Sequence, residues 1–397
     1  MMRKLIIVAG LFVLPCVLQA KTLDDLLVEK GVITKAEAGA ASAAGPKIYW
    51  NGGTRIEFPD QGFSTQINTF MQNRYTYTDA DEDAGAKNTS SFDIYKARII
   101  VSGTALNNEF YYKLAPDFIA DTDEGGEHTP RLVDAIIGWK PIQDVSIRMG
   151  QFKTGISRQY NTEDQSLQMI NRSKASDYFS LGREQGARAD AAIMDGALNV
   201  SAGIFNGESV GEAINQPGVD TKHTGIVNLS WNAMGKMDSK TEGDLDWSDS
   251  PALVFGAAYA ASRGDTATGD LDQDTISVDA SFKGQGWSMN AEYYVRTVSV
   301  EGDDDITPQG FYVQLGYFVD PKVLEIAAMY SLLDCDDGKA SGMCAGYDKV
   351  NHVQAGLNYY LWKHNLKAQL GFEHINQDNG SNDIDTNKWC LQLTAYF

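Results

Sequence analysis

Long apolar runs are missing from most of this 397-residue sequence. Beyond the N-terminal region, no stretch reaches the roughly 20 apolar residues that a membrane-spanning helix needs. Any membrane span would therefore be built from strands, whose backbone hydrogen bonds are satisfied in a closed barrel. Proline is also scarce, at 10 residues, whereas Gly (38), Tyr (18) and Phe (16) are plentiful. This composition suits many strands joined by turns better than a helical protein.

Positive charge is in short supply, with 33 Lys and Arg against 53 Asp and Glu. The resulting net charge of -20 argues against nucleic-acid binding, which requires a basic face to neutralise phosphates. The five histidines show no metal-ligand spacing, and no serine stands in a nucleophile-elbow context. We therefore expect no catalytic residue, no metal site and no cofactor; an enzyme would need a triad assembled from distant strands.

Only four cysteines are present. Cys335 and Cys344 fall in one expected loop, at a spacing that permits a local disulfide in an oxidising compartment. Cys390 is expected to be an ordinary strand residue. Cys16 allows a lipoprotein alternative, for which the neighbouring Pro15 is a poor fit.

The N-terminus has the pattern of a secretory signal. Arg3 and Lys4 precede an apolar run over residues 5–18, which is too short to span a bilayer and ends shortly before Ala20. We expect residues 1–20 to be a signal peptide. Residues 21–46 are expected to be a periplasmic segment with a short amphipathic helix and an Ala- and Gly-rich linker, followed by a single barrel domain over residues 47–397.

From residue 63 onward the dominant pattern is a period of two, which places alternate side chains on opposite faces of a strand. Polar residues alternate with the set Phe63, Thr65, Ile67, Thr69 and Met71. Lys96, Arg98 and Ser102 alternate with the set Tyr95, Ala97, Ile99 and Val101. A soluble sandwich could also alternate, so this pattern alone does not decide the class.

The connections favour a transmembrane antiparallel β-barrel. Short links are expected at residues 105–108, 141–144, 195–196, 284–286, 320–322 and 362–364. They interleave with long polar loops at residues 79–90, 120–130, 154–184, 206–221, 262–272, 301–307, 334–346 and 377–385. Short turns on one side and long loops on the other are typical of outer-membrane barrels, and we expect about 16 strands. The long link at 232–250 breaks the pattern, and residues 53–58 form an additional short strand of uncertain partner.

The last strand, residues 387–397, carries an apolar face that ends on the aromatic Phe397. It resembles the C-terminal signal through which the barrel-assembly machinery recognises outer-membrane proteins. Aromatic residues at expected strand ends suit girdles in contact with outer-membrane lipid and lipopolysaccharide. These residues are Tyr75, Tyr77, Trp139, Tyr259, Tyr293, Tyr317 and Trp389.

Several stretches, taken in order, resemble the phosphate-selective porins O and P. They are the strand 95–103 with IIVSG, EFYYKLAPDF at 109–118, MGQFKTG at 149–155, NRSKASDYFSLGREQG at 171–186 and GIFNG at 203–207. The resemblance covers essentially the whole chain after the signal peptide. It implies a homotrimeric barrel of about sixteen strands through which small anionic solutes diffuse, with one loop folded into the lumen as a constriction.

An anion pore needs fixed positive charge along the permeation path. The stretch 145–190 is locally basic, with seven Lys and Arg against five Asp and Glu. The basic residues at the expected inward-facing positions of the strands are Lys96, Arg98, Lys113, Lys140, Arg148 and Arg296. The loop 154–184 adds further cations. The predicted pore-lining, substrate-binding residues are Lys96, Arg98, Lys113, Arg148, Lys153, Arg158, Arg172, Lys174 and Arg183.

Other interpretations stay open at this point. Inward acids could pair with these cations as salt-bridge ladders and leave little selectivity, the available ones being Asp93, Asp117, Asp134 and Glu292. Acidic loops could even favour cations. The sequence therefore predicts an outer-membrane porin for small hydrophilic solutes, anions such as phosphate first among them, in a Gram-negative bacterium. The alternative is a structural or receptor-like barrel that serves as scaffold for an envelope complex.

Overall fold

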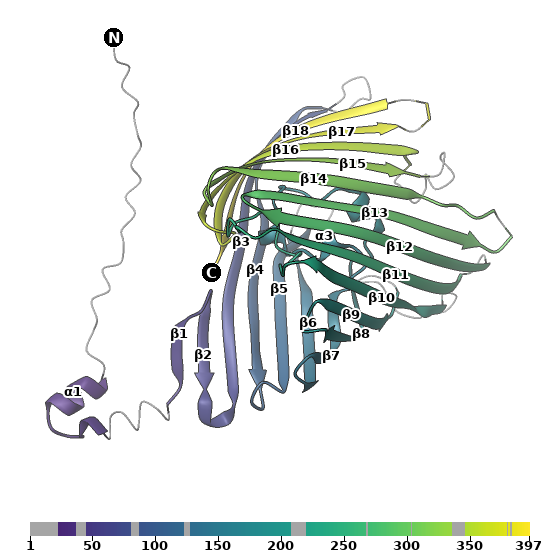
Figure 1. The fold of residues 1–397 in the computed structure, drawn as a ribbon. Helices are drawn as coiled ribbons and strands as arrows, with labels where there is room; N and C mark the ends of the chain where they lie inside the picture. Colours follow the sequence, from purple (N-terminus) through teal and green to yellow (C-terminus); the bar gives the residue numbers. More distant parts are fainter. Residues whose placement is uncertain are drawn as a thin grey trace, which may run out of the picture.

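The computed structural model describes residues 23–36, 45–80, 87–122, 128–207, 220–266, 269–302, 304–335, 346–378, 380–381 and 383–397. Within these residues, sixteen antiparallel strands form a closed barrel (Figure 1). Its first eight strands are β3 (Phe63–Ala80), β4 (Thr89–Ala105), β5 (Phe110–Thr122), β6 (His128–Ile142), β7 (Val145–Lys153), β8 (Arg183–Ile193), β9 (Leu198–Phe205) and β10 (Asp220–Met234). The other eight are β11 (Ala252–Thr266), β12 (Gly269–Gly284), β13 (Trp287–Val300), β14 (Gln309–Asp320), β15 (Leu324–Asp334), β16 (Lys349–Trp362), β17 (Leu366–Asp378) and β18 (Asp383–Tyr396).

The barrel closes where its last strand meets its first. β18 pairs with β3 from Thr386 opposite Ala80 to Tyr396 opposite Phe70. The terminal residue continues this ladder, because Phe397 and Thr69 exchange two backbone hydrogen bonds. Among the sixteen described barrel strands, closure leaves no free edge, which is the condition for placing a sheet in lipid.

A short hairpin extends the wall below the end of β18. β1 (Lys47–Trp50) pairs with β2 (Thr54–Phe58), and β2 pairs with the first residues of β3, so the short strand expected at 53–58 does join the sheet. Trp50 packs on Trp362 and Phe397, with ring centroids 5.9 and 6.5 Å apart. These aromatic contacts seal the junction on the side of the barrel that carries the short turns.

The two faces of the wall differ as the alternation predicts. On β18, Leu391 and Leu393 are about half exposed on the outside, whereas the intervening Gln392 is buried inside. Outward aromatic rings pair near strand ends, as in Tyr77 with Trp389 and Trp287 with Tyr317. Such rings form the girdles expected at the two membrane interfaces. Among the described residues, no helix combines the length and the apolar character needed to cross a membrane.

Two expectations about the wall were wrong. Residues 262–272 are not a long loop, because β11 and β12 continue their pairing from Ser262 opposite Gln273 to Thr266 opposite Gly269. Ion pairs from Arg263 to Asp272 and Asp274 stabilise this hairpin extension. Tyr95 does not follow the outward parity of its neighbours, because a β-bulge on β4 interrupts the register at that residue. Bulges re-aim side chains, and Tyr95 lines a lumenal cavity.

The remaining elements are short helices. α1 (Leu23–Glu29) lies within the expected periplasmic segment and stands apart from the barrel in Figure 1. η1 (Pro59–Gln61) precedes β3, and α3 (Arg158–Asn161), η2 (Asp164–Ser166) and α4 (Lys174–Phe179) lie in the connection between β7 and β8. The expected signal peptide lies outside the described residues, and the domain boundaries stay predictions.

Candidate functional site

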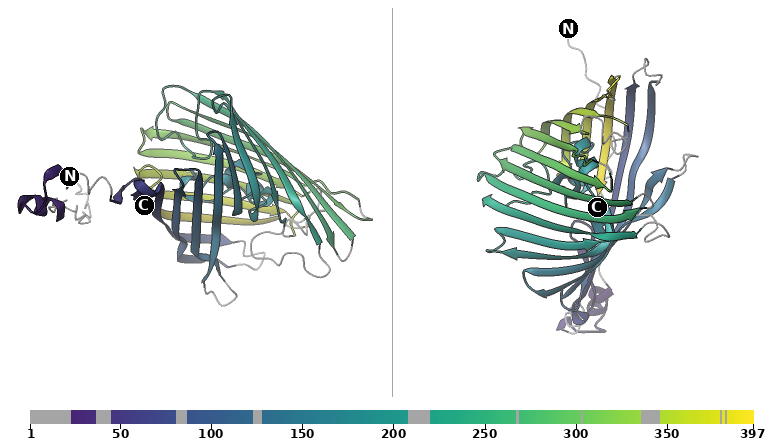
Figure 2. Two further views of the ribbon diagram at one scale, coloured as in Figure 1. Left: turned by 90° about the horizontal axis from the view of Figure 1, so that it is seen from below. Right: turned by 90° about the vertical axis from the view of Figure 1, so that its right-hand side faces the viewer.

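The connection between β7 and β8, residues 154–182, folds into the barrel and is called here the inserted loop. Its helices α3 and α4 lie inside the ring of strands (Figure 2). Each begins at a serine whose hydroxyl accepts a backbone hydrogen bond, from Tyr160 to Ser157 and from Ser176 to Ser173. Such N-caps stabilise short helices that would not form alone.

The inserted loop is held against the far wall by polar contacts. The backbone amides of Arg158 and Gln159 donate to the carboxylate of Glu292 on β13, at 2.8 and 3.2 Å. Nearby, the ring of Phe179 stacks on Tyr294, with centroids 5.1 Å apart. The fit is close, since a Cβ on Gly316 would lie within 2 Å of the Gln168 side chain. A larger residue here would force the Gln168 amide out of its hydrogen bonds with Ser288 and Glu325.

A second insertion enters from the opposite end of the barrel. Residues 235–251, called here the turn segment, connect β10 and β11, and they are the long link that breaks the short-turn pattern. The backbone amide of Glu242 donates to Ser166 of the inserted loop, and its carboxylate accepts from the amide of Gln168. Leu245 is buried in a cluster with Phe318 and Tyr360. The turn segment is therefore a packed part of the lumen.

Together the two insertions cover the inward face of β12–β17, which is called here the filled half of the lumen. Most inward polar side chains there are almost completely buried and bound to the insertions or to each other. They include Ser277, Glu292, Gln314, Glu325, His352, Gln354, Asn358, Lys367 and Gln369. Buried polar groups are tolerated because they are hydrogen-bonded, so this half is a polar core.

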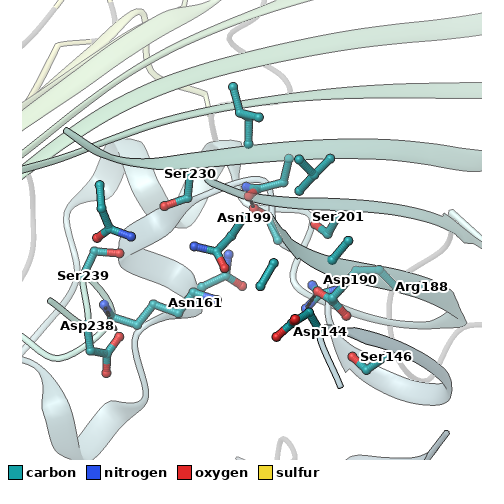
Figure 3. Close-up of a pocket in the computed structure, with 18 of the residues that line it drawn as sticks. Asp144, Ser146, Asn161, Arg188, Asp190, Asn199, Ser201, Ser230, Asp238 and Ser239 are labelled. Atoms are coloured by element: carbon teal, nitrogen blue, oxygen red, sulfur yellow. Dashed lines mark hydrogen bonds and ion pairs between the residues drawn. The ribbon is translucent and has the colours of Figure 1, made fainter. Parts of the chain in front are cut away.

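The inward face of β3–β9, called here the open half, is accessible in part, although Arg98, Asp117 and Asp134 are buried. Lys96, Lys113 and Arg148 keep 22%, 27% and 24% of their side-chain surface exposed. A cavity of ≈ 740 Å³ lies between this wall and the two insertions, with Lys113, Lys153 and Lys240 in its lining. A further cavity of ≈ 460 Å³ borders it, where Asn161, Asn199, Ser201 and Arg188 are shown in Figure 3. These cavities therefore lie along the β3–β9 wall.

Acidic residues neutralise part of this basic wall. Asp117 binds Arg98 at 2.7 Å, and Asp134 binds Lys113 at 2.7 Å and Arg183 at 2.9 Å. On neighbouring strands, Arg148 and Arg188 lie directly opposite each other and share Asp190, at 2.8 and 2.9 Å. The ladder considered from the sequence therefore exists for Asp117 and Asp134, while Glu292 instead holds the inserted loop.

Two acids of the inserted loop face the centre of the wall. Asp164 lies between Arg98 and Arg172, at 2.8 and 2.7 Å, and Glu163 lies between Lys113 and Lys153, at 3.6 and 3.3 Å. Burial opposes ionisation of Asp164, but Arg172 and Arg98 outweigh it and hold its pKa well below the usual range. The pKa of Glu163 is lowered by Lys153 and Lys113 against the same effect of burial. Both groups are thus negatively charged at neutral pH.

The structure brings most of the predicted pore-lining residues together. Six lie on the open-half wall, namely Lys96, Arg98, Lys113, Arg148, Lys153 and Arg183. From the inserted loop, Arg172 and Lys174 line a cavity of ≈ 340 Å³ with Lys96. Arg158 lies elsewhere: it is buried in the filled half and donates to Ser239 and Glu242 of the turn segment. Its pKa is raised because nearby Tyr312 and Glu242 outweigh the effect of burial.

Several residues of the site were missed from the sequence. Arg74 lies on the polar parity of β3 and stacks over the Tyr95 ring at 3.6 Å, and Arg188 alternates with three alanines on β8. Extending the alternation along both strands would have found them. Glu163 and Asp164 carried no such signal, because they lie in a loop with no period. Their role depends on how that loop folds inward.

The cysteines and potential metal ligands can be placed in part. Cys335 is disulfide-bonded, and Cys344, its expected partner, lies outside the described residues. Cys390 is free and buried on β18, 3.7 Å from the Thr76 hydroxyl. In the part of the chain that the structure describes, no three His, Cys, Asp or Glu side chains are grouped to hold a metal ion.

Comparison with known proteins adds the family. Residues 67–397 match the phosphate-selective porin O and P family. This chain belongs to that family. It is an outer-membrane porin of a Gram-negative bacterium, with the channel fold of that family and no positive sign of catalysis. No curated protein matches the sequence significantly.

Solved porins share the fold at low sequence identity. The anion-selective porin of Comamonas acidovorans has a TM-score of 0.62 and 12% identity, over 84% of this chain and 100% of that one. The outer membrane channel DcaP of Acinetobacter baumannii has a TM-score of 0.62 and 14% identity, over 85% and 98%. The trimer form of Vibrio cholerae OmpT has a TM-score of 0.55 and 12% identity, over 84% and 99%.

Proposed function

We propose that the open half of the porin conducts small anions, phosphate among them. The observation that most supports anion conduction is the basic wall of β3–β9, which is the accessible part of the lumen. Cations on a permeation path replace part of the hydration that an anion loses on entry. Charges that are partly buried, as these are, are screened less by bulk salt than fully exposed charges.

Charge along this path supports anion preference without making it strong. Around the acids Asp117, Asp134, Glu163 and Asp164 lie six cations, Lys96, Arg98, Lys113, Lys153, Arg172 and Arg183. The balance is positive by two charges. The anion selectivity of the Comamonas porin points the same way.

The test is the reversal potential of the purified porin in planar bilayers across a chloride salt gradient. We expect an anion-selective sign, and phosphate added to chloride is expected to reduce the chloride current. A cation-selective reversal potential would overturn the proposal. Anion selectivity with no effect of phosphate would leave a general anion porin, and well-folded protein without channels would favour the scaffold alternative.

We further propose that the porin works as a homotrimer in contact with outer-membrane lipid and lipopolysaccharide, after insertion by the barrel-assembly machinery through β18. The trimer form of the Vibrio cholerae protein and the aromatic girdles support this assembly. Chemical cross-linking of the folded protein in detergent tests it. Trimer-sized products are expected, and monomer alone would exclude the trimer.

A further inference from the structure

Glu163 differs from the other acids of the permeation path in how it is held. Its side chain is 41% exposed, whereas those of Asp134, Asp164 and Asp117 are 6%, 10% and 0% exposed. Each of those buried acids is bound by an arginine at 2.7 to 2.9 Å. Arginine holds a carboxylate by short, directional hydrogen bonds. Among the described residues, Glu163 forms ion pairs with two lysines, and both contacts are longer.

The two lysines have closer partners of their own. Lys113 lies 2.7 Å from Asp134 but 3.6 Å from Glu163. Lys153 donates to the carbonyl of Thr162 at 2.9 Å, closer than its 3.3 Å contact with Glu163. Lysine is a compact charge with three donors, so both side chains can keep these partners and still bind a further oxyanion. Glu163 therefore occupies the position between the two lysines, called here the seat, without being bound there firmly.

We propose that the seat between Lys113 and Lys153 is a binding site for permeating oxyanions, and that the Glu163 carboxylate competes for it from within the chain. The inference rests on the proposed anion conduction and deepens it by naming Glu163 as the residue that sets affinity. A solute with a phosphate or carboxylate group displaces Glu163 toward the open cavity. After the solute leaves, the Glu163 side chain returns and occupies the site again.

The strength of this competition follows from the short link that tethers the Glu163 carboxylate to the chain. A group tethered by a short flexible link competes at an effective concentration in the millimolar range or above. A solute must exceed that to occupy the site for long, which keeps its binding weak. Weak binding suits conduction, because a pore site must release the ion as readily as it takes it. Removing the carboxylate while keeping the side-chain shape should therefore tighten binding.

The experiment is phosphate block of chloride current in planar bilayers, with wild type, Glu163→Gln and the control Glu301→Gln. Glu301 is exposed in the connection between β13 and β14, so the control makes the same charge change away from the seat. We expect Glu163→Gln to lower the half-blocking phosphate concentration about tenfold. The control should leave it unchanged. Adding Lys153→Met to Glu163→Gln should abolish the gain.

The outcomes separate this inference from the proposed function. If wild type conducts anions but Glu163→Gln binds phosphate no tighter, or less tightly, the competition does not exist. An equal gain in Glu301→Gln would show a general charge effect, which also overturns it. If Glu163→Gln does not fold, Glu163→Asp provides the test, because its shorter side chain reaches the lysines less well and should give a smaller gain. A cation-selective wild type would instead defeat the proposed function.

Discussion

The same residue type at the same inward parity has different roles in the two halves of the lumen. Lys367 on β17 is fully buried and donates to the carbonyl of Leu167 in the inserted loop. Lys96 on β4 keeps 22% of its side chain exposed and lines a cavity. Facing inward does not make a residue part of the permeation path. The insertions decide this, because they cover β12–β17 and leave β3–β9 open.

The filled half is packed like the interior of a soluble protein, but many of its buried side chains are polar. Amide side chains of the wall donate to backbone carbonyls of the inserted loop, as Asn358 and Gln369 do to Gln168 and Gln354 does to Asn171. Each such bond compensates for the hydration that the group has lost. The open half instead leaves Lys96, Lys113 and Arg148 partly hydrated, so these cations remain available to solutes.

The largest effect is expected from removing the turn segment. Replacing residues 237–249 by a short Gly-Ser link should uncover part of the filled half and raise single-channel conductance by about half or more, because conduction follows the open cross-section. The matched control is Asp246→Asn, which only breaks an exposed ion pair with Lys363. Unchanged conductance in a folded deletion variant would mean that the inserted loop alone closes this half.

The next effect concerns stability. Arg158→Met leaves the buried carboxylate of Glu242 without its cation, and breaking a buried pair in this way costs about 3 kcal/mol or more. The variant should lose its folded mobility on gels at a lower temperature than wild type. Arg263→Met, which removes an exposed cation on β11, should cost about 1 kcal/mol at most. Equal losses would show that Arg158 does not hold the two insertions together.

A smaller effect is expected when charge reversal in the inserted loop is compared with charge reversal in the expected loop 334–346. Arg172→Glu combined with Lys174→Glu should shift the reversal potential toward cations, because these charges lie where screening by bulk salt is least effective. Lys339→Glu, outside the described residues, should barely change it. Since Arg172 also donates to the carbonyls of Gln159 and Thr162, Lys174→Glu alone is the cleaner variant. No shift in the double variant would exclude the loop as constriction.

The sequence predicted the wall well because a strand has a short, regular period. Alternation located the inward cations Lys96, Arg98 and Lys113, and turn chemistry located most hairpins. It misplaced Tyr95, since one bulge residue changes the parity locally and leaves no mark in the pattern. The period describes a strand, not its irregularities.

The halves of the lumen could not be predicted in the same way. They depend on contacts between residues far apart in the chain, such as Glu242 with Ser166 and Arg158 with Glu242. Arg158 carries the same local signal as Arg172, a cation in a locally basic loop, yet only Arg172 faces the open half. Which wall a loop residue contacts depends on how the whole loop docks. The period of the sequence carries no information about this docking.

The smallest effect is expected from pH. Glu163 faces Lys113 on β5, Lys153 on β7 and Arg183 on β8, with Asp164 beside it, and its pKa is lowered against the effect of burial. A lowered carboxyl pKa means that the charge, and any stability it gives, is present above the ordinary value and is lost only as pH falls through the lower, folded-state value. An ordinary Glu, with a pKa of about 4.3, would be mostly protonated at pH 4.

The difference in reversal potential between wild type and Glu163→Gln should therefore persist almost unchanged from pH 7 to pH 4. Asp177, whose pKa is raised by burial, titrates at a higher pH than Glu163, but it does so in both proteins and cancels in the difference. If the difference instead fades between pH 5 and pH 4, Glu163 titrates as a free side chain. The two lysines would then not hold it, and the open half would carry one fewer fixed anion than the structure assigns.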